Sequence, residues 1–280
     1  MPQADIYVYH NQSTDDTSEQ ARKAGAIVKQ EHRKGKGNVV RRMFSDIDAD
    51  VYLMVDGDGT YDSKRAHDLV NLLINHEADM VIGRRVEVSA SAHRQGHKWG
   101  NWLFNTILKF VFSSHFKDIL SGYRVFSKRF VKTFPAMSNG FDIETEMSVF
   151  ALNLKLHTIE VDTDFFDRIE GTESKLSTFK DGFKIALRIF NLFREFRPLY
   201  LFSLIALALT VFCLILGFPL IMTYMETQTV PRMPTAMICV GLGILSVMSI
   251  TLGLILDGIA LLRRETLKVQ LNQYSHKNLS

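Results

Sequence analysis

Two aspartates separated by one glycine, Asp56 and Asp58, follow a short apolar segment at residues 51–55. An apolar run of this length, rich in β-branched and aromatic residues, predicts a buried strand. In open α/β sheets, ligands bind outside the carboxyl ends of the strands. Two carboxylates at such an end suit Mg²⁺ or Mn²⁺, because substrate phosphates can supply further oxygen ligands. The pattern therefore predicts a metal-bridged phosphate site.

Other interpretations of the same acidic segment compete with a metal site. Asp and Gly are common turn residues, so a solvated acidic turn is one alternative. An EF-hand loop needs Gly at its sixth position and Glu at its twelfth, and counting from Asp56 gives Tyr61 and His67, which excludes it. The segment also resembles the nucleophile motif of haloacid-dehalogenase-type phosphatases. There Asp56 would attack a phosphoryl group and Asp58 would act as the acid/base.

The composition indicates one substantial domain with additional apolar segments. The chain has 280 residues, of which 46% are hydrophobic, and a formal net charge of +3. This charge is too small to indicate binding to nucleic acid. Cys213 and Cys239 both lie in apolar stretches, so the sequence predicts neither a disulfide framework nor a Cys/His metal cluster.

Two long uncharged stretches lie near the C-terminus, at residues 199–225 and 233–256. Each exceeds the roughly 20 residues that cross a bilayer core. The short connection between them predicts a transmembrane hairpin. Basic residues flank it on both sides, at Arg188, Arg194, Arg197, Arg263, Arg264 and Lys268. By the positive-inside rule, both flanks and the soluble domain are expected in the cytoplasm, with the hairpin in a bacterial inner membrane.

Residues 178–197 carry apolar side chains at three- and four-residue spacing, with basic residues between them. This pattern predicts an amphipathic helix in the membrane interface. A helix packed on the soluble domain is the alternative. Either arrangement would hold the soluble domain close to the bilayer.

The N-terminal part alternates between predicted strands and helices. Strands are expected at 4–9, 26–29, 51–55 and 79–82, and helices near 14–25, 39–47 and 63–76. Short connections between alternating elements predict a layered α/β domain with a mostly parallel, Rossmann-like sheet. A basic Gly-Lys loop at 33–38 opens the second helix, where it would be either a phosphate cradle or a solvated turn.

Several short motifs occur in a fixed order, and together they resemble family 2 glycosyltransferases with the GT-A fold. They are Asn11-x-Ser-Thr-Asp15-x-Thr, Gly35-Lys36-Gly37, Asp56-x-Asp58, Gly83-Arg84-Arg85, Ser121-Gly122-Tyr123-Arg124 and Arg168-x-x-Gly171-x-x-Ser174-Lys175. The last two are similar to motifs of the polyprenyl-phosphate sugar transferases, the group that contains dolichyl-phosphate mannosyltransferase. The similarity covers most of residues 4–197. A phosphatase of that type would also need a second acidic pair later in the chain, and no suitable pair is found. The glycosyltransferase interpretation is therefore preferred.

The resemblance implies a role for each matching residue. Asp56 and Asp58 would bind the metal, Mg²⁺ or Mn²⁺, that holds the donor diphosphate, with Asp58 counted among the catalytic groups. Asn11, Asp15, Lys36 and Asp56 would bind the donor, and Asn11 stands where relatives often carry an Asp that contacts the nucleobase. Arg85, Arg124, Arg168, Ser174 and Lys175 would bind the acceptor phosphate, with Arg124 also in a catalytic role. Guanidinium groups suit this task because they hold phosphate oxygens bidentately.

The reaction implied by the resemblance is an inverting transfer of a sugar from a UDP- or GDP-sugar to a polyprenyl phosphate, for an envelope polysaccharide or another glycan. A phosphate acceptor is already ionised near neutral pH, so no strong general base is required. Glu144 and Glu146 are candidate catalytic residues that would orient the sugar or the acceptor. Alternatively, they are an acidic cluster favoured by the dipole at the start of a helix.

The predicted organisation is a GT-A domain over 1–177, an interfacial helix over 178–197, two transmembrane helices over 198–262 and a cytoplasmic tail over 263–280. Relatives begin with a strand and a Pro-x-x-Asn-Glu type of loop, ahead of the strand that here starts near residue 4. Without them we expect weaker donor binding, and a non-catalytic homologue is the alternative function. The hairpin could also support self-association into a homo-oligomer.

Overall fold

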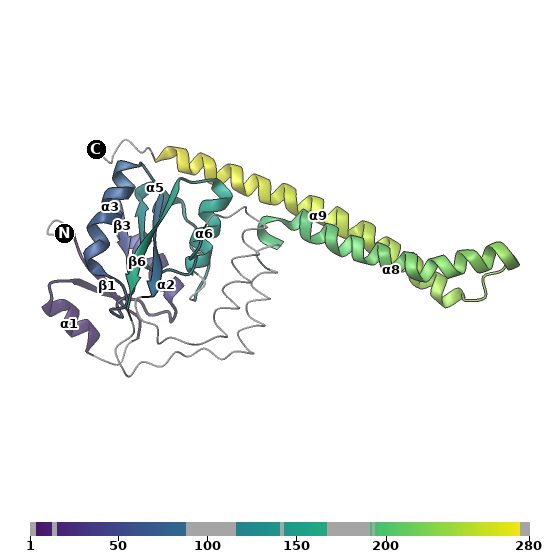
Figure 1. Cartoon of the computed structure of the whole chain (residues 1–280), viewed down its shortest axis with the longest axis horizontal. Coiled ribbons are helices and arrows are strands. Elements are labelled where there is room, and N and C mark those ends of the chain that lie inside the picture. Colours follow the sequence, from purple (N-terminus) through teal and green to yellow (C-terminus); the bar gives the residue numbers. More distant parts are fainter. Residues whose placement is uncertain are drawn as a thin grey trace. The chain divides into compact units, whose positions relative to one another are not determined.

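The computed structural model describes residues 4–12, 16–87, 116–140, 143–166, 191 and 194–274 (Figure 1). It divides the chain into two compact units. The first comprises Met1–Leu176 together with Leu267–Ser280, and the second comprises Ser177–Thr266.

The first unit alternates between strands and helices along the sequence. Its elements are β1 (Tyr7–His10), α1 (Thr17–Lys23), β2 (Ile27–Gln30), α2 (Lys36–Asp46), β3 (Val51–Met54), a 3₁₀ turn (Ser63–Arg65), α3 (Ala66–Asn75), β4 (Met80–Glu87), β5 (Arg124–Ser127), α5 (Lys128–Thr133), α6 (Ile143–Leu154) and β6 (Thr158–Phe165). The predicted α/β class is confirmed. The predicted strands agree with β1 to β4, although β4 continues through Arg85 to Glu87.

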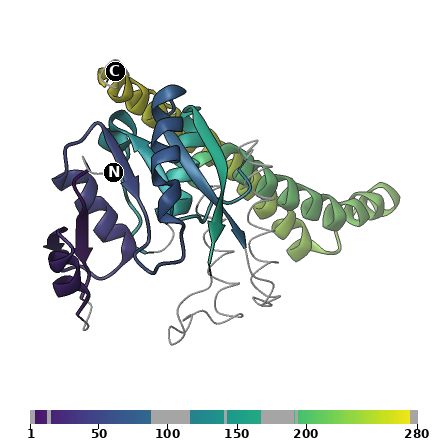
Figure 2. The ribbon, with the colours of Figure 1, turned by 60° about the vertical axis from the view of Figure 1, so that its left-hand side comes forward.

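The strands form two sheets, and the larger one is mixed. β1 and β2 pair in parallel as a separate two-stranded sheet (Figure 2). The four-stranded sheet has the order β3-β5-β4-β6, in which β5 runs antiparallel to both neighbours and β4 runs parallel to β6. A mostly parallel sheet was expected from the sequence. The expectation needs a correction in the larger sheet, because β5 lies between β3 and β4 and runs antiparallel to both.

The core lies on both faces of the four-stranded sheet, with α3 and α6 on opposite sides (Figure 1). On the α3 face, one buried cluster contains Tyr61, Leu69, Leu73, Ala78, Val81, Tyr123 and Val125. On the other face, ring contacts join Phe44, Phe126, Phe130, Phe134 and Phe150. Successive strand residues point to opposite faces, which explains why the neighbours Val125 and Phe126 enter different clusters.

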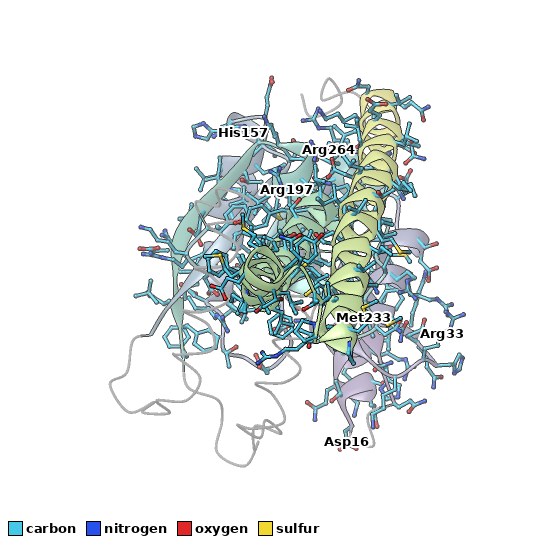
Figure 3. All side chains as sticks on the ribbon, turned by 90° about the vertical axis from the view of Figure 1, so that its right-hand side faces the viewer. Asp16, Arg33, His157, Arg197, Met233 and Arg264 are labelled. Atoms are coloured by element: carbon cyan, nitrogen blue, oxygen red, sulfur yellow. The ribbon has the colours of Figure 1, made fainter. Side chains whose placement is uncertain are left out.

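The second unit contains the long apolar helix α8 (Pro198–Thr227) and most of the long helix α9 (Met233–Gln273), whose last residues belong to the first unit; their side chains are shown in Figure 3. Their most apolar windows have mean hydropathies of 2.8 and 2.4, and only 6% and 11% of those windows is buried in the structure. Apolar helices exposed to this extent need apolar surroundings, which suggests a membrane anchor. The helix α9 passes without a break through the predicted start of the tail at residue 263.

Small polar groups join α8 to α9. The hydroxyls of Thr210 and Ser246 lie 2.8 Å apart, and the Ser246 hydroxyl also donates to the Ala206 carbonyl at 3.0 Å. Such contacts replace the hydrophobic driving force that helices lack inside a lipid phase. The predicted interfacial helix at 178–197 lies largely outside the described residues, which include only 191 and 194–197 of it.

A buried carboxylate, Asp79, joins four elements of the first unit. It accepts two hydrogen bonds from the Arg129 guanidinium, one from the Ser127 hydroxyl at 3.2 Å and one from the His157 backbone N–H at 3.2 Å. His157 precedes β6 and is labelled in Figure 3. Asp79 is fully buried and immediately precedes β4. Its contacts therefore fix the start of β4 against β5, α5 and β6.

We expect Asp79→Ala to destabilise the first unit by about 3–5 kcal/mol, because it leaves the Arg129 charge without its partner. The measurement is denaturant unfolding of the detergent-purified chain, followed by near-ultraviolet circular dichroism. Asp164→Ala is the matched control, since Asp164 is exposed on β6, and it should change stability by less than about 0.5 kcal/mol. Equal effects of the two substitutions would contradict the structural role of Asp79.

Candidate active site

The Asp56 carboxylate lies at the end of β3, against the backbone of Gly122. A Cβ atom on Gly122 would come within 2.4 Å of Asp56 Oδ2, so only glycine leaves room for the carboxylate. The Gly122 N–H donates to the Tyr61 hydroxyl at 2.9 Å. These contacts explain why the Asp-Gly-Asp segment and the Ser-Gly-Tyr-Arg segment both belong to one site.

Asp58 lies at the exposed tip of the same loop. Its Oδ1 accepts hydrogen bonds from the Thr60 hydroxyl at 2.6 Å and the Thr60 N–H at 3.3 Å. The Thr60 carbonyl in turn accepts from the Phe166 N–H at 2.9 Å, which ties the loop to the end of β6. Thr60 thus orients Asp58 by direct hydrogen bonding.

A lysine ammonium connects Asp56 to α6. Lys36 Nζ lies 2.5 Å from Asp56 Oδ1 and also contacts Glu144 Oε1. The Lys36 side chain is only 18% exposed. Burial opposes its positive charge, but the carboxylates of Glu144 and Asp56 outweigh that effect and raise the pKa of Lys36 above its usual range. Lys36 therefore stays charged at neutral pH.

The two glycines beside Lys36 allow the backbone to approach another loop closely. Gly35 has φ +124°, a conformation that favours glycine, and a Cβ atom there would lie 2.1 Å from the Asn139 carbonyl oxygen. A Cβ atom on Gly37 would lie 2.1 Å from the Ser138 carbonyl oxygen. The Gly-Lys-Gly motif therefore serves to place Lys36 at the start of α2.

The loop at 136–139 is itself held by two charged side chains. Glu146 accepts hydrogen bonds from the N–H groups of Met137 at 2.9 Å and Ser138 at 2.8 Å. Arg41 donates to the carbonyl of Ala136 at 2.7 Å and to that of Met137 at 3.2 Å. Both oxygens of Glu146 are engaged with backbone amides, so the structure gives it a positioning role in place of the predicted contact with sugar or acceptor.

Glu144 is the second carboxylate on Lys36, at the beginning of α6. It is 3% exposed, and its Oε2 atom is buried without a hydrogen-bond partner among the described residues. Lys36 therefore contacts only one of the two oxygens of the Glu144 carboxylate. Of the two predicted glutamates, only Glu144 has a direct contact with the Asp56 site.

Arg124 lies in the protein interior, where it contacts α6 one turn after Glu144. It is fully buried, and its guanidinium donates to the carbonyls of Ser121 at 2.8 Å and Ile119 at 2.6 Å and to the Ser148 hydroxyl at 2.9 Å. Burial lowers the pKa of Arg124 to about 10, against the opposing effect of the Glu144 charge. Since the guanidinium has no exposed surface, this structure assigns Arg124 to positioning and not to acceptor contact.

Arg85 is partly exposed and interacts electrostatically with Asp56. Its Nε and one terminal nitrogen each lie 2.8 Å from an Asp118 oxygen, and the guanidinium lies 5.5 Å from the centre of the Phe165 ring. Burial disfavours the charge of Arg85, but Asp118 raises its pKa and the charge of Asp56 acts in the same direction. Burial likewise opposes ionisation of Asp118, yet the Arg85 hydrogen bonds keep its pKa below the usual range.

The remaining predicted residues lie elsewhere or outside the described part. Asn11 donates to the carbonyls of Glu31 at 3.2 Å and Arg33 at 2.7 Å, and accepts from the Gly35 N–H at 2.8 Å. Its carboxamide thus fixes the 31–35 loop. Four predicted site residues are outside the described residues, namely Asp15, Arg168, Ser174 and Lys175.

The donor set fits a divalent ion that is shared with a substrate. Asp56 and Asp58 offer hard carboxylate oxygens, which suit Mg²⁺ and Mn²⁺. Among the described residues, no group of three or more His, Cys, Asp or Glu side chains could form a complete cage. Mg²⁺ is commonly bound by one or two carboxylates together with substrate phosphates and water, which this pair allows.

Comparison with known proteins identifies the family. The profile described as "Glycosyl transferase family 2" matches residues 2–134. Glycosyltransferase AglJ of Haloferax volcanii is 35% identical over 209 residues, which cover 74% of this chain and 69% of that protein. The chain belongs to glycosyltransferase family 2. This confirms the predicted family and transferase class, and it removes the phosphatase interpretation of Asp56.

Other matches add a bacterial relative and a shared fold. Protein RfbJ of Shigella flexneri is 54% identical over 99 residues, covering 35% of this chain and 77% of that protein. Among solved structures, glucosyl-3-phosphoglycerate synthase from Mycobacterium tuberculosis has a TM-score of 0.51 at 17% identity, covering 67% of each chain. At this identity the likeness shows the fold alone, and it confirms the GT-A architecture.

Three site residues of this glycosyltransferase gained a role only from the structure: Tyr61, Asp118 and Gly122. Gly122 stands inside a motif that the sequence singled out and Tyr61 lies three residues after another, but their mutual hydrogen bond joins positions 61 residues apart. Asp118 carries no motif, and it pairs with Arg85 across 33 positions.

We expect Gly37→Ala to lower the stability of the first unit by about 1–3 kcal/mol, because the added methyl group overlaps the Ser138 carbonyl and must displace backbone. Gly57→Ala is the control, because a Cβ atom at Gly57 meets nothing within 4 Å. Denaturant unfolding of both variants measures the difference. If Gly37→Ala is as stable as Gly57→Ala, then the close packing of the Gly-Lys-Gly motif is not a constraint.

Proposed function

We propose that this chain is a membrane-anchored, inverting glycosyltransferase that moves a hexose from a UDP- or GDP-sugar to a polyprenyl phosphate. The observation that carries the proposal is the site itself, in which Asp56 pairs with the Lys36 ammonium and interacts electrostatically with the Arg85 guanidinium, in a chain with two lipid-compatible helices. Carboxylates with a divalent ion suit a diphosphate donor, and a separate guanidinium suits a second phosphate.

The names of relatives support the donor and the sugar class. The low-salt glycan biosynthesis hexosyltransferase Agl6 of Haloferax volcanii is 32% identical over 200 residues, covering 70% of this chain and 47% of that protein. The Mycobacterium tuberculosis synthase was crystallised with Mn²⁺, UDP-glucose and phosphoglyceric acid, in a structure with a TM-score of 0.51 to this chain. By analogy, we infer a nucleotide-hexose donor and Mg²⁺ or Mn²⁺ as the cofactor.

On the donor side, Asp56 and Asp58 would hold the metal, which neutralises negative charge on the departing diphosphate. Lys36 is already positioned against Asp56 and would add a second positive charge there. Asn11 and Asp15 are proposed for the nucleoside end, with Asn11 acting through the loop that it fixes. This arrangement stabilises the charge that develops as the glycosidic bond breaks.

On the acceptor side, Arg85 is the described residue best placed to meet a phosphate. Its guanidinium is held rigidly by Asp118 but keeps part of its surface exposed, with the side chain 29% accessible. Arg168, Ser174 and Lys175 are proposed for the same phosphate on the basis of their motif. The acceptor oxygen is ionised at neutral pH, so it can attack the anomeric carbon without a general base. Arg124 and Glu146 would support the site indirectly, by holding the backbone of the 119–121 and 137–138 segments.

The hairpin α8–α9 would anchor the enzyme where a polyprenyl phosphate is available. Basic residues before α8 and in the C-terminal part of α9 favour an orientation with the catalytic domain and both termini in the cytoplasm, at a bacterial inner membrane. A lipid-borne acceptor then reaches the site at the membrane surface. The product class would serve an envelope polysaccharide or a related glycan.

The direct test is sugar transfer by membranes that contain the protein, with undecaprenyl phosphate and radiolabelled UDP-glucose, UDP-N-acetylglucosamine or GDP-mannose. One of these donors should label the lipid, and Asp58→Ala should reduce that rate at least 100-fold because a metal ligand is lost. Asp50→Ala, an exposed acid outside the site, is the control and should leave the rate unchanged. Unchanged transfer by Asp58→Ala would refute the metal site. If none of the three donors labels the lipid, the result contradicts the proposal that undecaprenyl phosphate is the acceptor.

Arg85→Lys should raise the KM for polyprenyl phosphate about tenfold and leave the KM for the donor within a factor of two. Lysine cannot reproduce the bidentate geometry of a guanidinium, which accounts for the loss. Arg84→Lys is the matched control, since Arg84 pairs with Asp162 on the exposed side of the same strand. Equal effects of both substitutions on the acceptor KM would remove Arg85 from the acceptor site.

A further inference from the structure

In this structure the Lys36 ammonium lies on the same carboxylate that the proposed function assigns to the metal. It is 2.5 Å from Asp56 Oδ1. An ammonium at hydrogen-bond distance occupies one of the directions from which a cation can approach that carboxylate. A divalent ion on Asp56 would therefore compete with Lys36 for the same oxygen or lie beside it, where the like charges repel each other.

The Lys36 backbone is fixed, so the ammonium cannot leave the site by a movement of α2. Its backbone lies at the start of α2, pressed against the 138–139 backbone through Gly35 and Gly37. Within this constraint, the side chain has two carboxylate partners, Asp56 and Glu144. A ligand with negative charge near Asp56 would supply a third.

The diphosphate of a nucleotide donor can bind both the metal and the Lys36 ammonium, which removes the competition for Asp56. Its oxygens can coordinate the metal and accept hydrogen bonds from an ammonium at the same time. Lys36 can then leave Asp56 for the diphosphate, and Asp56 becomes available to the metal. Glu144 retains its contact with Lys36 and keeps the ammonium near the site during the exchange.

On the basis of the proposed function, we propose that Lys36 is a shared cation that binds Asp56 in the ligand-free protein and the donor diphosphate in the complex. It thereby couples the two ligands, so that the metal binds weakly alone and tightly together with the nucleotide. Lys36 acts as a donor-binding residue, and its effect is on binding order as well as on affinity.

The test measures Mn²⁺ binding to the detergent-purified full-length chain by electron paramagnetic resonance of the free ion, in the absence and presence of UDP or GDP. In the wild-type chain, the matching nucleotide should increase Mn²⁺ affinity at least tenfold. Lys36→Met should bind Mn²⁺ alone about tenfold more tightly than the wild type, and the nucleotide should then improve affinity no more than about twofold.

Two further variants make the result specific. Lys34→Met removes an exposed lysine of the same loop that forms no ion pair among the described residues, and it should behave as the wild type. Lys36→Arg retains the charge and should retain the coupling, which also guards against a folding defect in Lys36→Met. Loss of coupling in Lys36→Arg together with normal coupling in Lys36→Met would refute a role for the charge.

The outcomes separate this inference from the proposed function. If the wild type binds Mn²⁺ with the same affinity with and without either nucleotide, the shared-cation role is refuted, while sugar transfer can still be observed. If Lys36→Met shows wild-type Mn²⁺ affinity and wild-type coupling, the inference is refuted by itself. If the wild type binds no Mn²⁺ under any condition, the proposed donor site is refuted, and the shared cation with it.

Discussion

The contact of one ammonium with two carboxylates is the interaction on which the rest of the site depends. Lys36 comes from the start of α2, Asp56 from the end of β3 and Glu144 from the start of α6. Removing Lys36 would leave the buried Glu144 carboxylate without its ion-pair partner, which is costly for a charge shielded from water. The three elements are therefore held at one relative position by electrostatics, in addition to the apolar core beneath them.

This arrangement explains features of the sequence that do no chemistry themselves. The glycines on both sides of Lys36 let its backbone reach the 138–139 loop, and Glu146 holds that loop from the opposite side. Gly122 gives room to the Asp56 carboxylate. In each case, a small or charged residue places a backbone segment, and the segment in turn places a side chain of the site.

The sequence predicted those features that depend on neighbouring residues. The strand before Asp56, the helix after the Gly-Lys-Gly motif and the two apolar helices follow from short-range patterns, and the structure contains all of them. It could not predict the direction of β5, because a short apolar run has the same appearance in a parallel or an antiparallel strand. Arg124 was assigned to the acceptor because its motif resembles that of the polyprenyl-phosphate sugar transferases, although the structure buries its guanidinium among carbonyl groups.

The residues that determine the environment of a charge were the hardest to foresee. Arg85 was selected by its motif, but its partner Asp118 comes from a distant segment without any pattern. Glu144 and Glu146 are two positions apart on one helix, and only their different neighbours separate a site contact from a loop support. Such distinctions depend on three-dimensional proximity, which local sequence does not encode.

The unbroken course of α9 has a mechanical consequence. Its 41 residues span about 60 Å at 1.5 Å per residue, whereas the hydrocarbon core of a bilayer is about 30 Å thick. In the proposed membrane anchor, roughly half of the helix would therefore emerge from the bilayer as a stiff rod. Because thickness mismatch is relieved by tilting, a thinner or thicker membrane would change the angle of that rod, and lipid composition becomes a force that acts on the emerging half.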